Sequence, residues 1–488
     1  MKKIIDYIYP TKYYYITAVI LSIVLLAISD KIFLPTVNLL PLIFIIIFVL
    51  ISAIIAIFKN PNIGILITLA IMPFENIGGF YFHSIHIRFD QIIIGLTSFI
   101  FIIHSLINKD FKIKKDKTLI VIALLIIANI LSLTASINLT RNLEIFIFTL
   151  ITFIIYYSIP LNFFDTKYIK YIPSVVLSIT IILSIFGLYQ YFGNIFGLPG
   201  SVLGLRAPYV KSVLGYPRIE ATEIEPLYYG TYLIFSVTLS LGLLIFNKGK
   251  KILTDNQYRL AIGALILGGL NLILTYARGA WIGEILAIIV IAIIFLIEFQ
   301  VPKKTIYTSI GVILVLGIIV FGLYKVDKLP HFAQNLISRA TNLNSPDRVF
   351  LDNNAIQAFE TSPIFGIGSG GFGPYMSVNP YVMPPQNFGQ IEGFGWAIVN
   401  NEYLEILTET GILGAALFIY FFYLIFRNFI KAYKKKKNMD LEKIILVSSF
   451  AALCGILLQY ATFSTIYILQ IWMVIFIVEV IAFKILND

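Results

Sequence analysis

Apolar runs long enough to cross a membrane follow one another along most of this chain, with short polar loops between them. A helix that spans a bilayer needs about 20 predominantly apolar residues. Strands of a transmembrane barrel are about 9–11 residues long and alternate apolar with polar positions, which these continuous runs do not. The sequence therefore predicts an all-α fold, a polytopic transmembrane helical bundle.

The runs give fourteen candidate spans, or twelve or thirteen if the short third run, which ends at Pro73, does not cross. They lie at 13–29, 39–58, 62–74, 91–107, 118–134, 143–158, 172–193, 224–246, 259–276, 280–298, 306–324, 402–427, 441–460 and 463–484. We divide the chain into N-terminal helices (1–194), central helices with the first outer loop (195–324), a large extracytoplasmic loop containing short helices (325–400) and C-terminal helices (401–488).

Composition agrees with this pattern, because 59% of the residues are hydrophobic and only 13% are charged. The net charge of +10 on its own is compatible with nucleic-acid binding. However, the lysines gather in alternate loops, as the positive-inside rule requires of a membrane protein. We therefore predict no nucleic-acid partner and place both termini in the cytoplasm.

Arginine is distributed differently from lysine. In this topology seven of the nine arginines lie on the outer side, namely Arg88, Arg141, Arg206, Arg218, Arg278, Arg339 and Arg348. A guanidinium group offers five donors in a planar fork that fits phosphate or carboxylate. Interfacial anchoring and structural ion pairs are the alternative explanation for any one of them. Seven together favour binding of an anion outside the membrane.

Two outer segments are long enough to build a site. The first, 192–223, contains Arg206 and Arg218 and leads into an acidic group, Glu220, Glu223 and Glu225. The second runs from about 325 to 401, and in it Ser345 is a candidate N-cap with Pro346 at the first helical position, which predicts a short helix over 346–360. The glycines that follow permit tight turns and close approach to a ligand, or form an ordinary glycine-rich loop; they are Gly366, Gly368, Gly370 and Gly371.

Three carboxylates stand in the next span. Glu402, Glu405 and Glu409 share one helical face because they are spaced three and four residues apart. Ionisable groups inside a span are functional candidates, and we take Glu402 and Glu405 as candidates for a catalytic base. The alternative is a stabilising role at the helix N-terminus. The acidic group of the first outer loop could bind sugar hydroxyls or supply the base, and His331 is a further candidate.

Several stretches of the second half resemble a known family. Four stretches in succession resemble the signature of the O-antigen ligase and Wzy-type polymerase superfamily. They are Asp347-Arg348, Ser362-Pro363-Ile364-Phe365-Gly366-Ile367-Gly368-Ser369-Gly370-Gly371-Phe372, Asn401-Glu402-Tyr403-Leu404-Glu405 and Glu409-Thr410-Gly411-Ile412-Leu413-Gly414. Tyr276-Ala277-Arg278-Gly279-Ala280-Trp281 is similar to the arginine-glycine motif of that family.

The resemblance implies a glycosyltransferase of the bacterial inner membrane, inverting and metal-independent, with no cofactor and with an outward-facing active site. Its partners would be an undecaprenyl-pyrophosphate-linked glycan, an acceptor glycan or lipid, the lipid bilayer and a chain-length regulator. Arg278 and Arg218 best match the arginines that hold the pyrophosphate in this family, and with Glu402 and Glu405 they form the predicted catalytic set. The predicted substrate-binding residues are Arg206, Arg348, Tyr276, Glu225, Asn400, Asn401, Gly368 and Gly370.

One position departs from the family pattern. Ligases of this family carry a histidine directly before the asparagine of the last motif, where this chain has Asn400. An amide cannot accept a proton at neutral pH. We therefore favour a polymerase that joins lipid-linked repeat units into a surface polysaccharide, with ligase-type transfer to a lipid or protein as the alternative. A flippase for lipid-linked glycans is a second alternative, but its internal repeats are not seen here.

Overall fold

The computed structural model describes residues 51–76, 80–82, 85–109, 111–114, 116–213, 215–247, 252–300, 346–379, 397–464 and 466–488, with the short pieces 302, 304, 324, 334 and 336–339. Ten helices in this part of the chain are long and apolar enough to cross a membrane by length and composition. They correspond one for one to the expected spans between 91 and 298 and between 402 and 484. The all-α prediction is confirmed. The expected spans at 13–29 and 306–324 lie outside the described residues, apart from residue 324, and the span at 39–58 is described only from residue 51.

The long helices keep the predicted order. They are α5 (Phe89–Ile107), α6 (Lys117–Ser132), α7 (Leu139–Leu150), α9 (Ile172–Ile195), α11 (Pro226–Phe246), α12 (Asp255–Leu274), α13 (Arg278–Glu298), α18 (Glu402–Lys435), α19 (Leu441–Gln459) and α20 (Leu469–Asn487). A π-helical stretch, Ile151–Ser158, and α8 (Ile159–Phe163) extend α7, and 3₁₀ turns at Leu133–Ala135, Thr166–Tyr171, Ala207–Tyr209 and Tyr460–Thr462 flank other helices.

The shorter elements are not among these ten helices. They are α4 (Pro61–Ile71), α10 (Gly200–Leu203), α16 (Pro346–Thr361), α17 (Phe372–Val378) and an antiparallel hairpin of β1 (Phe80–Phe82) and β2 (Ile85–Ile87). One of them, α4, occupies the short third run expected at 62–74. The short helix expected over 346–360 is therefore present as α16.

Helices α11, α19 and α20 form the centre of the bundle, where most of their residues are buried. α13 packs along α19 and α11, and α12 lies between α11 and α9. Gly283 of α13 and Gly455 of α19 approach so closely that a Cβ on Gly283 would lie 2.7 Å from the carbonyl oxygen of Gly455. Small residues at such crossings let helices pack closely in lipid, where the hydrophobic effect does not drive their association.

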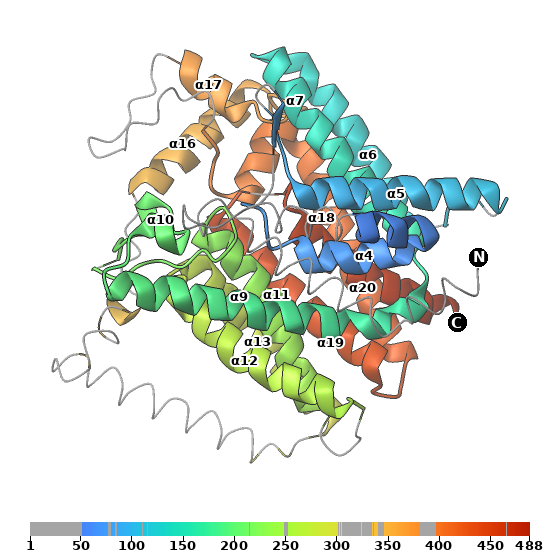
Figure 1. The fold of residues 1–488 in the computed structure, drawn as a ribbon. Helices are drawn as coiled ribbons and strands as arrows, with labels where there is room; N and C mark the ends of the chain where they lie inside the picture. The colour runs from blue at the N-terminus through green and yellow to red at the C-terminus, as the bar shows by residue number, and fades with distance from the viewer. Residues whose placement is uncertain are drawn as a thin grey trace.

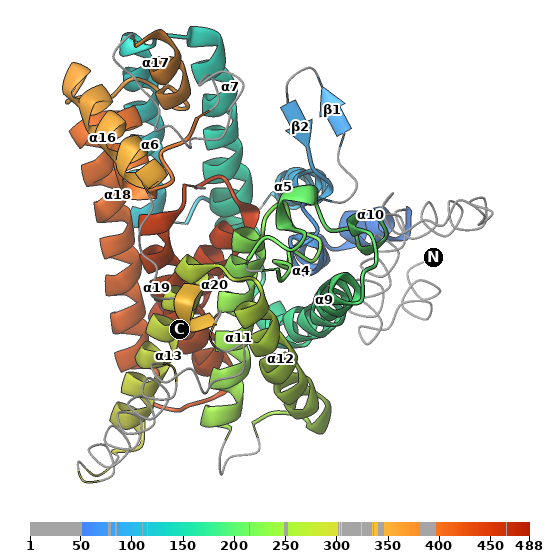
Figure 2. The ribbon, with the colours of Figure 1, turned by 90° about the vertical axis from the view of Figure 1, so that its left-hand side faces the viewer.

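The helices do not all run in one direction. α18 runs alongside α6 and α20, whereas α4, α5 and α9 cross its direction (Figures 1 and 2). α16 packs on α18, and the hydroxyl of Thr408 in α18 donates to the backbone carbonyl of Ala355 in α16 at 3.0 Å. The described helix α16 of the 325–400 segment is thus anchored to the first turns of α18.

Candidate functional site

Four arginines from separate parts of the chain converge on one cavity of about 220 Å³. Arg218 lies in the loop before α11, Arg278 is the first residue of α13, and Arg339 and Arg348 come from the second outer segment. The cavity is also lined by Glu225, Leu227, Tyr228, Tyr276, Ala277, Gly279, Ile398, Asn400, Thr462 and Phe463. The structure therefore brings together six predicted site residues, Arg218, Arg278, Arg348, Tyr276, Glu225 and Asn400.

Three helices begin at this cavity. α11 starts at Pro226, α13 at Arg278 and α18 at Glu402, each directly at or one or two residues after a lining residue. The N-terminus of a helix carries partial positive charge and free backbone N–H groups, which favour a bound anion. The three helix ends and the four guanidinium groups therefore act in the same sense.

Arg218 is fixed to the turn that carries Arg278. Its Nε donates to the backbone carbonyl of Thr275 at 3.2 Å, and its guanidinium carbon lies 5.6 Å from the centre of the Tyr209 ring. The next residue, Ile219, donates its N–H to the carbonyl of Leu274, the last residue of α12. The outer loop and the α12–α13 turn thereby hold the two arginines in a defined arrangement.

The charges of the cavity are unbalanced. Burial lowers the pKa of Arg218 and of Arg348 from the usual arginine value. For Arg339, burial and the positive charges of Arg218, Arg278 and Arg348 lower the pKa to about 10. Burial raises the pKa of Glu225, the one carboxyl group among the described lining residues, against the opposing effect of Arg206 and Arg218. Like charges held together out of water favour a multivalent anion as the ligand.

The other three outer arginines form ion pairs in the described part of the chain. The pairs are Arg88 with Glu75 and Asp90 (both 3.3 Å), Arg141 with Glu144 (3.6 Å) and Arg206 with Glu220 (2.9 Å). Glu220 is fully buried and also accepts the backbone N–H of Arg206 at 2.8 Å. Arg206, predicted to bind substrate, therefore holds the outer loop together, and it is not among the residues that line the cavity.

Two lining residues adopt a left-handed backbone conformation. Tyr276 has φ 50° and Asn400 has φ 60°. Asparagine takes this conformation more readily than most residues, whereas for tyrosine it is uncommon. Backbone strain of this kind persists where the surrounding structure holds it, and it gathers at functional sites. Their role in substrate binding stays a prediction, and the structure places both residues at the cavity.

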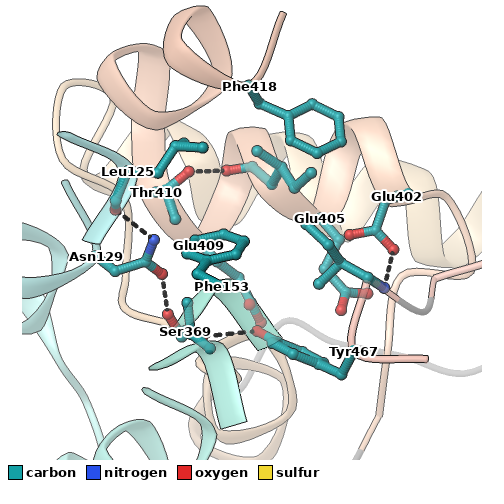
Figure 3. A pocket seen from close by; sticks show the side chains of 13 residues that line it. Leu125, Asn129, Phe153, Ser369, Glu402, Glu405, Glu409, Thr410, Phe418 and Tyr467 are labelled. Carbon is teal, nitrogen blue, oxygen red and sulfur yellow. Dashed lines mark hydrogen bonds between the residues drawn. The ribbon is translucent and has the colours of Figure 1, made fainter. Parts of the chain in front are cut away.

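Glu402 and Glu405 lie elsewhere. They line a second, small space of about 30 Å³ together with Glu409 and with Asn129, Ser369 and Tyr467 from other helices and loops (Figure 3). A volume of this size accommodates about one water molecule and no sugar. Asn401, predicted to bind substrate, accepts the backbone N–H of Leu404 at 3.4 Å and caps α18.

The glycine-rich loop docks onto a break in α18. Gly411 interrupts this helix with φ 65° and ψ −170°. At the break the N–H of Ile367 donates to the carbonyl of Thr408 at 3.1 Å, and the N–H of Ile412 donates to the carbonyl of Pro363 at 2.9 Å. The two family motifs of the sequence therefore bind each other through their backbones, and a missing side chain permits the approach.

Gly368 and Gly370 contact the protein rather than the arginine cavity. A Cβ on Gly368 would lie 1.8 Å from the amide nitrogen of Asn142, and one on Gly370 would lie 2.5 Å from the side chain of Ile145. Both neighbours belong to α7. The close approach that the glycines permit is thus made by α7 and α18, and neither glycine lines the cavity in the described part of the chain.

Replacing Gly411 with alanine is expected to destabilise the folded protein by roughly 2–6 kcal/mol, because an alanine with positive φ and a forced contact each cost about 1–3 kcal/mol. Its Cβ would lie 2.3 Å from the carbonyl oxygen of Ile364. Gly269→Ala in α12 is the matched control, since no atom lies within 4 Å of its Cβ position, and it should melt at or slightly above the wild-type temperature. Thermal unfolding in detergent measures both. Equal melting temperatures of the two variants would contradict the docking.

Sequence reasoning did not include Arg339 and Tyr228 among the site residues. Arg339 belongs to the outer arginine group, so the asymmetry between lysine and arginine was the signal that could have found it. Tyr228 occupies the first turn of α11 and looks in sequence like any aromatic residue at a span end. His331 lies outside the described residues. Among those that are described, no group of three His, Cys, Asp or Glu side chains could hold a metal ion, and metal independence stays a prediction.

Comparison with known proteins finds a family match for part of the chain. Residues 263–419 match the family model described as O-antigen ligase. The matched segment contains Arg278, Arg339, Arg348 and Asn400 of the cavity, whereas Arg218 and Glu225 precede it. A comparison with curated proteins found no match. The resemblance seen in the motifs is thereby confirmed over this segment.

Proposed function

We propose that this chain, whose residues 263–419 are an O-antigen ligase domain, is a multi-pass membrane glycosyltransferase that takes a glycan from an undecaprenyl-pyrophosphate carrier. The convergence of four arginines on one cavity carries the proposal. A pyrophosphate presents oxygens on two phosphorus atoms, and guanidinium groups supply paired donors that fit them. The helix N-termini at the cavity add positive potential.

The reaction needs charge stabilisation at one end and a proton acceptor at the other. The acceptor hydroxyl oxygen forms a bond to the anomeric carbon, while the bond from that carbon to the phosphate oxygen breaks. The electron pair of the broken bond leaves with undecaprenyl pyrophosphate, where Arg278 and Arg218 stabilise the developing charge. The hydroxyl proton passes to a base, and we assign this role to Glu225 because it is the carboxyl group at the cavity wall.

Asn400 favours a polymerase over a ligase in this proposal. It lines the cavity beside the arginines, where its amide can hydrogen-bond a sugar hydroxyl but cannot take its proton. An acceptor that is itself a lipid-linked glycan offers such hydroxyls. The product would be a surface polysaccharide assembled from repeat units.

The proposed topology places the cavity on the outer face of a bacterial inner membrane. α11, α13 and α18 begin at the cavity, and in the sequence a lysine comes at or soon after the other end of each, namely Lys248, Lys303 and Lys434. Lysine-rich loops are retained in the cytoplasm. The distribution therefore supports a cavity that opens outward.

A reconstituted assay tests the function. Purified protein in vesicles is given undecaprenyl-pyrophosphate oligosaccharide alone, or together with a lipid or protein acceptor. Lengthening of the carrier-linked glycan is the expected result. Single transfer to the added acceptor would identify a ligase, and movement across the bilayer without a new glycosidic bond would overturn the proposal in favour of a flippase.

A further inference from the structure

The three carboxylates of α18, Glu402, Glu405 and Glu409, form what we call the carboxylate row. They occupy one face of the helix at intervals of three and four residues. Glu402 and Glu409 are buried, with exposed fractions of 1% and 6%, and Glu405 is partly buried. Carboxylates at a helix N-terminus are common because of the helix dipole. That effect fades after the first turn, so it does not account for Glu409.

Each member of the row accepts a backbone N–H from a different segment. Glu402 Oε2 accepts from Ile466 at 3.0 Å, and Glu405 Oε2 accepts from Val399 at 2.9 Å. Glu409 accepts from two residues of the glycine-rich loop, from Gly370 through Oε2 at 2.7 Å and from Phe372 through Oε1 at 3.4 Å. Hydrogen bonds from N–H groups to a carboxylate are among the strong ones in proteins.

Two of these segments are walls of the arginine cavity. Val399 stands between Ile398 and Asn400, which both line it. Ile466 follows the turn that contains Thr462 and Phe463, which also line it. The backbone N–H of Glu402 donates to the carbonyl of Phe463 at 3.2 Å, so the helix holds this turn at two points.

The third segment supports the helix that carries Arg348. Phe372 and Ile367 of the glycine-rich loop pack in one apolar cluster with Leu351 and Ala355 of α16. Arg348 lies in the first turn of this helix. The row therefore binds, from one helix face, three segments that form or support the cavity wall: the segment around Val399, the turn before Ile466 and the glycine-rich loop that packs on α16.

We propose that the carboxylate row positions the outer segments around the arginine cavity, with Glu405 setting Asn400, Glu402 setting the turn at Phe463 and Glu409 setting α16. The proposal rests on the proposed function of that cavity. It makes Glu402 and Glu405 positioning residues that act through the backbone, in place of the role of base that the sequence suggested. Their own space of about 30 Å³ does not admit an acceptor sugar.

Conservative replacement separates positioning from catalysis at Glu402 and Glu405. Each of them accepts one backbone N–H through one oxygen, and Glu405 also hydrogen-bonds the side chain of Ser464. The carbonyl oxygen of glutamine can accept the same backbone N–H. A base replaced by glutamine cannot take a proton. Glu405→Gln is therefore expected to keep the rate of transfer within about three-fold of wild type. Glu405→Ala should lower that rate by about 10-fold or more, as expected when a hydrogen bond to a charged group is lost.

Hydrogen–deuterium exchange in lipid nanodiscs tests the same contacts without reference to activity. Glu405→Ala should speed exchange chiefly in the peptide over 397–401, because Glu405 accepts the N–H of Val399, and Glu402→Ala should speed it chiefly in the peptide over 463–468, because Glu402 accepts the N–H of Ile466. Glu360→Ala is the control, because this glutamate of α16 is exposed and is not part of the row. It should change neither exchange nor transfer.

The outcomes separate the two proposals. Equal loss of transfer in Glu405→Gln and Glu405→Ala, with unchanged exchange at Val399, would overturn positioning and return Glu405 to a role on the substrate. Faster local exchange with full transfer in both alanine variants would show that the row does not shape the cavity. If the alanine variants changed exchange as expected but wild-type protein transferred no glycan from the carrier, the hydrogen bonds of the row would be confirmed and the proposed function contradicted.

Discussion

Arg278→Ala is expected to lower kcat/KM for glycan transfer by roughly 100-fold or more, the effect typical of losing a preorganised donor to a charge that develops in the transition state. Arg278 begins α13 and lies on the cavity with Arg218, Arg339 and Arg348. Its removal takes away a paired donor at the point where a helix N-terminus already favours an anion. Arg218→Ala should have a similar effect because Arg218 is held against the same turn.

Two further variants make this result specific. Arg278→Lys keeps the charge but loses the planar fork, so it should recover only part of the activity. Arg259→Ala is the matched control, since Arg259 is an exposed residue of α12 that does not line the cavity. Kinetics are measured on vesicles with equal amounts of inserted protein. Near-normal transfer by Arg278→Ala would contradict the proposal that this cavity binds the pyrophosphate.

The helices could be read from the sequence because each depends on local information. Apolar runs of sufficient length gave all ten described spans, and Ser345-Pro346 gave the start of α16. The hairpin of β1 and β2 was not expected. Its strands contain three residues each, too short for a periodic pattern to reveal.

The arginine group shows what the distribution of one residue type along the chain can and cannot predict. It predicted an anion site on one side of the protein, and four of its seven members do converge. The other three form ion pairs with Glu75 and Asp90, Glu144 and Glu220. The pairs of Arg141 with Glu144 and of Arg88 with Asp90 join near neighbours in the chain, and the spacing of three residues on α7 makes the first of them readable from the sequence. The pairs with Glu75 and Glu220, and the convergence of the other four arginines, depend on contacts between separate segments, which no spacing encodes.

The glycines and the carboxylate row also show that the sequence can predict a feature without predicting what it contacts. The sequence indicated close approach at Gly368 and Gly370 and a shared face for Glu402 and Glu405, and both features are present. It assigned both to the substrate. The structure shows backbone and side chains of the protein itself in those places, because a loop that packs on a broken helix and a loop that binds a ligand have the same composition.

Glu225→Gln is expected to lower kcat by about 100-fold or more, within the range for loss of a general base. Its pKa is raised by burial, so the base form is lost as pH falls through a value above the usual glutamate range of about 4.3. Wild-type kcat/KM should therefore rise with pH over this interval and then level off. The glutamine variant should keep a low activity without this acid limb.

The bound donor sharpens the test. A pyrophosphate beside Glu225 adds negative charge, which disfavours the ionised carboxylate. The acid limb of kcat, which reports the complex, should therefore lie at higher pH than the limb of kcat/KM, which reports the free enzyme. Glu220→Gln is a poor control, since it would break the ion pair with Arg206, so Glu360→Gln on the exposed face of α16 serves instead. An unchanged acid limb in Glu225→Gln would assign the base to another group, because a residue that only shapes the cavity does not titrate with the reaction.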